Sequence, residues 1–162
     1  MLDFNLNEML FSIPKESHKP SELKKILKAH PEIKFVSFSG LDIAGNDTDE
    51  RIPVKLFISD MKSMLSHGVQ TDGSSVNLPK IAELNNAKVD MIPDFDVNWY
   101  VDYNFANIDA KTGLPAGTLR IPSFLVHNES SYVGSRTILR DAVEKFKKDV
   151  KELIADHPYV IE

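Results

Sequence analysis

Two stretches of this sequence alternate between apolar and other side chains with a period of two. Such alternation is typical of a β-strand with one buried face, so both stretches are predicted to be strands of a sheet. Pro53 places the first strand at a sheet edge or near a strand start, because proline cannot donate a hydrogen bond to its neighbour. The apolar positions of the two stretches are Ile52, Val54, Leu56 and Ile58, then Val97, Trp99, Val101 and Tyr103.

The residues around these stretches complete a small domain. The β-branched and aromatic run 33–38 predicts another strand, and the Gly- and Asp-rich run 40–49 predicts a hairpin-like turn. A short helix is expected from Ser59 as N-cap to Gly68 as the C′ residue, and a short strand over 89–92. Strand, strand, helix, strand, strand is typical of an α+β fold, in which a helix packs on one face of a small mixed sheet.

Residues before and after this small domain include irregular stretches and two predicted helices. Residues 1–20 are expected to be a poorly fixed arm, although their apolar residues could dock as a short helix. Ser21 is expected to cap a short helix that ends at His30 before Pro31. Residues 107–134 are turn-rich, with a short strand or a packed crossover over 119–126. An amphipathic helix is predicted over 136–154, with Ser135 as its cap.

The expected organisation is an arm over 1–20, a domain over 21–106, and a connection over 107–162. The last four residues, 159–162, resemble the beginning of a strand, so we expect the chain to be a piece of a longer protein.

Composition excludes several classes of protein. The 162 residues are 42% hydrophobic and 27% charged, which is the balance of a globular domain with a real core. The absence of cysteine excludes disulfides, thiolate catalysis and cysteine-bound zinc. A net charge of −5 argues against nucleic acid as a partner, and no apolar run is long enough for a membrane span. A cytoplasmic location is the plain expectation.

The run from Thr71 to Ser75 is the candidate functional segment. One interpretation is an Asp-Gly turn whose hydroxyls bond to the backbone. The other is a loop that presents the carboxylate of Asp72 and a hydroxyl to a cation or polar substrate. No phosphate-binding, dinucleotide-binding, zinc-protease or serine-hydrolase motif occurs in the chain.

Several landmarks resemble the N-terminal signature of glutamine synthetases. In chain order they are Phe35-Val36 to Leu41-Asp42 and Gly45, Arg51-Ile52-Pro53, Asp72-Gly73-Ser74-Ser75, Val89-Asp90-Met91-Ile92-Pro93-Asp94, and Gly134-Ser135-Arg136-Thr137-Ile138-Leu139. The third resembles the family's F-D-G-S-S-I, the fourth its S-D-M-x-x-x-P-D, and the last its D-P-R-S. The resemblance spans about residues 33–155.

The resemblance implies a β-grasp-like domain followed by a linker helix into a catalytic domain. It also implies a glutamate–ammonia ligase in which the loop Asp72, Gly73, Ser74 and Ser75 is lent to a neighbouring subunit of a homo-oligomeric ring. Asp72 then corresponds to the ammonium-site aspartate and Ser75 to the serine beside it. Glutamate, ammonium and ATP would be the substrates and Mg or Mn the metal. The family's ATP and metal ligands lie beyond this stretch, so the chain alone is expected to be inactive.

The sequence also departs from the family pattern. Thr71 replaces the usual phenylalanine, and Val76-Asn77-Leu78-Pro79 replaces a stretch that bears glycine and tryptophan. The connection to the next strand and the run 107–133 are both longer than usual. Two other readings therefore stay open: a γ-glutamyl ligase that acts on another amine, and a non-catalytic β-grasp binding module.

Overall fold

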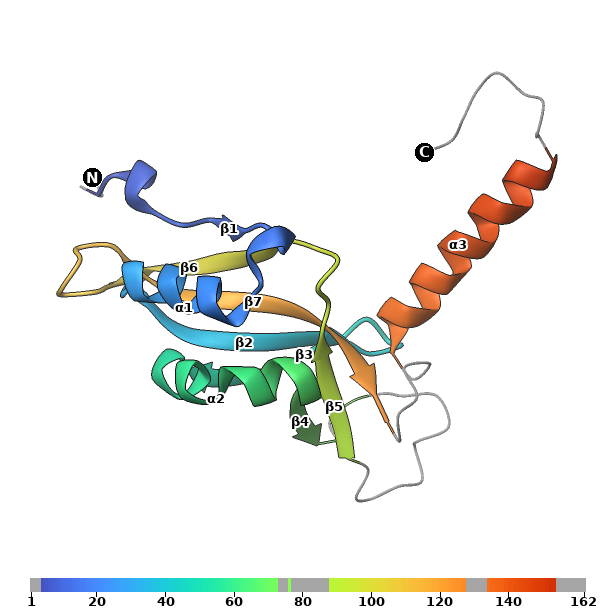
Figure 1. Cartoon of the computed structure of the whole chain (residues 1–162), viewed down its shortest axis with the longest axis horizontal. Coiled ribbons are helices and arrows are strands. Elements are labelled where there is room, and N and C mark those ends of the chain that lie inside the picture. Colours follow the sequence, from blue (N-terminus) through green and yellow to red (C-terminus); the bar gives the residue numbers. More distant parts are fainter. Residues whose placement is uncertain (1–3, 73–75, 77–87, 128–133, 154–162) are drawn as a thin grey trace.

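The computed structural model of the chain describes residues 4–72, 76, 88–127 and 134–153. Two helices lie against a sheet, and a third points away from it (Figure 1). The helices are α1 (Pro20–Ala29), α2 (Val54–His67) and α3 (Ser135–Leu153), with 3-10 turns η1 (Leu6–Glu8) and η2 (Lys15–Ser17). The strands are β1 (Ser12–Ile13), β2 (Ile33–Leu41), β3 (Asp47–Pro53), β4 (Val69–Asp72), β5 (Lys88–Pro93), β6 (Trp99–Ile108) and β7 (Pro115–Val126).

The described strands form a mixed sheet. Five of them lie in the order β1-β6-β7-β2-β3, and a ribbon of β4 and β5 joins the sheet through β7. β2 and β7 run parallel, and the other described pairs are antiparallel. The predicted α+β class, with a helix packed on a mixed sheet and a long helix after it, is confirmed.

One hydrophobic core lies between the sheet and the first two helices. Trp99 and Phe38 are completely buried on the sheet side, and Phe57 of α2 meets Phe38 edge-on at 6.2 Å between ring centroids. Leu23 and Leu27 bring the apolar stripe of α1 into the same cluster. The burial of Trp99 and the helix on one face of the sheet match the sequence prediction.

The predicted strand over 52–58 is wrong beyond Pro53. Val54 begins α2, and Pro53 takes the N-cap position instead of continuing a strand. The period-two reading left out Phe57, which forms a helical stripe with Met61 and Leu65, and all three are buried. Ser59 therefore does not cap the helix; it lies inside it and donates a hydrogen bond to the carbonyl of Leu56. Gly68 ends α2 as predicted.

Residues 107–134 contain a longer strand than the sequence suggested. β7 runs over twelve residues and pairs with β2, β5 and β6, so it occupies the middle of the sheet. Every second residue of β7 is buried. Two of these buried residues, Gly117 and Ser123, have no apolar side chain, so the sequence does not show a regular apolar alternation. Gly117 is required by a close approach, because a Cβ there would lie 2.9 Å from the side chain of Val101.

The N-terminal arm is docked against the sheet, which corrects the expectation of a poorly fixed segment. β1 pairs with β6, and Ile13 is completely buried. The hydroxyl of Tyr103 donates a hydrogen bond to the carbonyl of Leu10 and accepts one from its N–H, both at 3.1 Å. Burial, together with the nearby Glu32 carboxylate, raises the pKa of Tyr103 to about 12. The sheet thus draws strands from all three expected segments.

Two predicted helix caps are also corrected. α1 begins at Pro20, with Lys19 in the N-cap position, so Ser21 lies within its first turn. Proline is favoured there because its fixed φ suits the first helical residue and its missing N–H has no helical partner to lose. The hydroxyl of Ser135 donates a hydrogen bond to the carbonyl of Leu41 at 3.0 Å, so it links α3 to β2 rather than capping the helix.

Candidate functional site

Asp72 lies at the end of β4, where the β4–β5 ribbon leaves the body of the sheet. The register pairs Asp72 with Lys88 and Thr71 with Val89. Asp72 is exposed and Thr71 is buried, as expected for neighbours on opposite faces of a strand. The other members of the predicted loop, Gly73, Ser74 and Ser75, lie outside the described residues.

The entry to β4 is set by Gly68. Its φ of 77° lies in the left-handed region, and a Cβ there would come within 2.6 Å of the carbonyl oxygen of Met91. Any larger residue would push α2 and β5 apart, so Gly68 allows the tight turn that brings β4 alongside β5. The position of Asp72 at the end of the ribbon follows from this turn four residues earlier.

Asp90 is a second carboxylate on the Asp72 side of the ribbon. Directly opposite residues of an antiparallel pair share a face, so Asp72 shares its face with Lys88, and Asp90 with Gln70. Residues two apart on one strand also share a face, which places both carboxylates on the same side. Asp90 belongs to a sequence landmark but was not predicted to be a site residue. A prediction that β4 pairs with β5 would have identified Asp90, because that pairing places it on the same face as Asp72.

On the core side of this ribbon, Thr71 departs from the sequence pattern of the family. Thr71 is buried at the position where a phenylalanine was expected, and it lies opposite the fully buried Val89. A threonine fills less volume than a phenylalanine, so the core side of β4 is packed with a smaller side chain than the family pattern would supply.

Two other landmarks, far apart in sequence, are in direct contact. Nε and Nη2 of Arg136 both donate to Oδ2 of Asp94, at 2.9 and 2.5 Å. Asp94 is buried and is the last residue of the landmark Val89 to Asp94, and Arg136 lies at the start of α3. Both residues belong to sequence landmarks, but their pairing was not predicted from the sequence.

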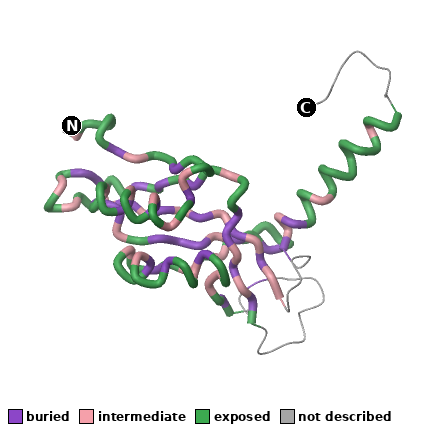
Figure 2. Tube along the Cα trace, in the orientation of Figure 1, coloured by how far each residue is buried: buried purple, intermediate pink, exposed green. Residues whose placement is uncertain are grey.

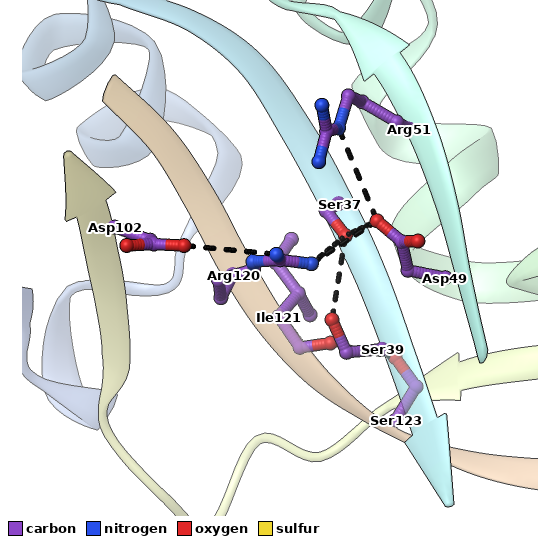
Figure 3. A network of polar contacts seen from close by, with 8 residues as sticks. All are labelled: Ser37, Ser39, Asp49, Arg51, Asp102, Arg120, Ile121 and Ser123. Atoms are coloured by element: carbon purple, nitrogen blue, oxygen red, sulfur yellow. Dashed lines mark hydrogen bonds and ion pairs between the residues drawn. The ribbon is translucent and has the colours of Figure 1, made fainter. Parts of the chain in front are cut away.

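A polar network crosses the face of the sheet opposite α2 (Figure 3). Nη1 of Arg120 lies 3.0 Å from Oδ2 of Asp49 and 3.0 Å from the hydroxyl of Ser37. The Ser37 hydroxyl donates to the same Asp49 oxygen at 2.7 Å. Side chains from β2, β3 and β7 are therefore joined by hydrogen bonds to one another. Nη2 of Arg120 also lies 3.6 Å from Oδ2 of Asp102 on β6, so the network is a tie between neighbouring strands of the sheet.

The chemical capacity of the described residues is limited. Within the described ranges, no three histidine or acidic side chains group as metal ligands. The Asp72 face offers carboxylates that could stabilise a small cation such as ammonium. No helix in the described part of the chain is long and apolar enough to cross a membrane.

Comparisons with known proteins support the fold. No protein-family model matches the chain, and no curated protein sequence matches it. Among solved structures, the cryo-electron microscopy structure of Plasmodium falciparum glutamine synthetase is similar, with a TM-score of 0.58 and 19% identity. The match covers 81% of this chain and 23% of that one, so the chain spans less than a quarter of its structural relative. The chain has a glutamine synthetase-like fold.

Proposed function

We propose that the chain is the N-terminal part of a glutamine synthetase-type ligase, which joins ammonium to glutamate with ATP. The similarity of its fold to the Plasmodium enzyme over 81% of the chain carries this proposal. Support also comes from the landmarks, which occur in family order. Asp72 ends β4, and the Asp94 and Arg136 landmarks meet at the base of α3.

The proposed role of Asp72 is to hold the ammonium ion. A carboxylate at the tip of an exposed ribbon can reach into the active site of a neighbouring subunit. Its charge favours ammonium there, and the carboxylate accepts a proton from it to leave the nucleophile ammonia. In the longer enzyme γ-glutamyl phosphate would form from glutamate and ATP with release of ADP. Ammonia then attacks its γ-carbonyl, the new C–N bond forms, phosphate leaves, and the nitrogen gives up its extra proton to solvent. Ser75 beside it would supply one hydrogen bond.

ATP and Mg or Mn are expected for the longer enzyme and not for this stretch. The described residues do not fit a metal site, because they offer no group of three acidic or histidine ligands. The chain alone should therefore neither make glutamine nor bind Mg-ATP with useful affinity. Clear saturable binding in a calorimetric titration would contradict this part of the proposal.

Complementation between two inactive variants of the longer enzyme tests the shared site. One variant carries Asp72→Asn and an intact catalytic domain, and the other carries an intact Asp72 loop and an inactivated catalytic domain. If the loop acts in a neighbouring subunit, mixed rings contain some complete sites and γ-glutamyl transfer activity returns. Asp60→Asn, an exposed carboxylate of α2, is the matched control and should leave activity unchanged. Background activity in confirmed mixed rings would contradict a shared site.

A related ligase that uses another amine is the second candidate. The observation in its favour is Thr71, which is buried next to Asp72 where the family pattern has a phenylalanine. Changing the packing beneath Asp72 changes the space available to the amine that it holds. Profiling the longer enzyme with ammonium and a series of primary amines separates the two, because a glutamine synthetase prefers ammonium throughout.

A further inference from the structure

Among the described residues, the side-chain contacts of α3 with the sheet lie in its first two turns, at Ser135, Arg136 and Arg140. Of its described side chains, only that of Thr137 is buried. Beyond the first turn the helix is largely exposed and points away from the sheet (Figure 2). In the described part of the chain, the contacts that can orient this 19-residue helix thus lie at one end of it.

The strongest of these contacts is the pair between Arg136 and Asp94. Both Nε and Nη2 of the guanidinium donate to Oδ2 of Asp94. The backbone of Asp94 is itself fixed twice: its N–H donates to the carbonyl of Pro122 at 2.8 Å, and its carbonyl accepts from Nε1 of Trp99 at 2.9 Å. Its second carboxylate oxygen accepts from the N–H of Asp96 at 2.9 Å. The acceptor is therefore rigid and buried.

Phe124 of β7 provides the second support. The guanidinium carbons of Arg136 and Arg140 lie 5.5 and 5.0 Å from the centroid of its ring. These two residues are four apart in α3, so they present neighbouring positions on one face of the helix to the same ring. A planar guanidinium that both stacks and donates restricts rotation in a way that a single point charge does not.

We infer that Arg136 is a positioning residue: its pairing with Asp94 and its stacking on Phe124 set the direction in which α3 leaves the sheet. The hydrogen bond from Ser135 to Leu41 adds a third attachment, to β2. Together these contacts hold the helix from the β5–β6 connection, β7 and β2. The inference goes beyond the proposed function and does not depend on any activity.

A distance measurement between α3 and the sheet domain tests it. The chain has no cysteine, so cysteines introduced at the exposed residues Lys62 and Glu152 can carry spin labels without further changes. Double electron–electron resonance should give a narrow distance distribution in the labelled parent. Arg136→Gln should broaden it by about twofold, because the charge-assisted hydrogen bonds and the stacked charge are both lost. Arg136→Lys keeps the charge and should recover part of the narrow distribution.

The matched control is Arg120→Gln, which removes an arginine from the other charged cluster of the sheet. It should leave the α3 distance unchanged. Phe124→Leu removes only the stacking and should broaden the distribution less than Arg136→Gln, which gives a second measure if one variant folds poorly. A parental distribution in Arg136→Gln would overturn the inference. Equal broadening in Arg120→Gln would overturn it as well, since the effect would then be general loosening.

Discussion

The imidazole of His18 stacks face to face on the indole of Trp99, with ring centroids 3.6 Å apart and planes 15° from parallel. Nε2 of His18 donates to the carbonyl of Ile13 at 3.4 Å, whereas Nδ1 is buried without a hydrogen-bond partner. A proton on Nδ1 would be a buried charge with no acceptor. Burial accordingly lowers the pKa of His18 below 6.5, despite its bond to Ile13 and the acidic groups of Glu16 and Asp94.

This pairing predicts a loss of stability at acid pH. In the unfolded chain the imidazole takes up a proton near its usual pKa of 6.5, while in the folded protein it does so only at lower pH. The unfolded state therefore binds more protons in between. The His18 contribution is fully present above pH 6.5 and is lost as the pH falls through the folded pKa. Denaturant unfolding at a series of pH values should show His18→Gln with a shallower decline than the parent. His67→Gln, at an exposed histidine, should decline as the parent does.

Phe57 and Leu56 distinguish the helix from the predicted strand. Phe57 is completely buried and Leu56 is 52% exposed, whereas a strand over 52–58 would bury Leu56 instead. Phe57→Ala should lower the free energy of unfolding by about 3–5 kcal/mol through lost burial and a cavity. Leu56→Ala should change it by less than about 0.5 kcal/mol. Chemical denaturation of both variants measures these losses. A larger loss in Leu56→Ala than in Phe57→Ala would favour the predicted strand over the helix.

The arm contributes to global stability through Ile13. Its side chain is completely buried, while that of Leu6 in the same arm is exposed. Ile13→Ala should lower the free energy of unfolding by about 2–5 kcal/mol. Leu6→Ala is the control and should be near neutral. If both variants unfold like the parent, the arm is not part of the cooperative unit.

The apolar side of α3 should be dispensable for folding. Phe146 is 60% exposed, and Ile138, Leu139 and Val143 are exposed on the same helix. An apolar patch of this kind favours association. Phe146→Glu should keep the unfolding free energy within about 0.5 kcal/mol of the parent and reduce self-association in sedimentation at high concentration. Lys148→Glu, also exposed on α3, is the control. Loss of cooperative unfolding in Phe146→Glu would mean that this side is packed.

Asp72 and Ser75 should differ in their effect on the longer ligase. Asp72→Asn keeps a side chain that also suits a turn but removes the charge that we propose favours ammonium. Loss of one preorganised charge costs on the order of 10²–10³ in rate. Ser75→Ala removes a neutral hydrogen bond worth about 0.5–1.5 kcal/mol and should cost less. Steady-state rates at saturating glutamate compare the two, and a larger loss in Ser75→Ala would contradict the role given to Asp72.

Local signals in the sequence were sufficient for much of the fold. The short helix before Pro31 and the glycine at the end of α2 were predicted because their causes lie within one or two turns of chain. The alternation over 97–103 likewise predicted β6, since side-chain direction in a strand depends only on its own backbone. The amphipathic pattern of α3 was visible for the same reason.

The tertiary structure decided what depends on distant partners. The apolar residues between Val54 and Ile58 fit both the two-residue period of a strand and the 3.6-residue period of a helix. The helix forms because it buries Phe57 against Phe38. Gly117 has no side chain to signal a buried strand; its place in β7 is explained by Val101 on the neighbouring strand. Asp94 and Arg136 are 42 residues apart, so their contact exists only after β5, β7 and α3 have come together. The sequence by itself determined the local elements, and packing decided which of their side chains meet.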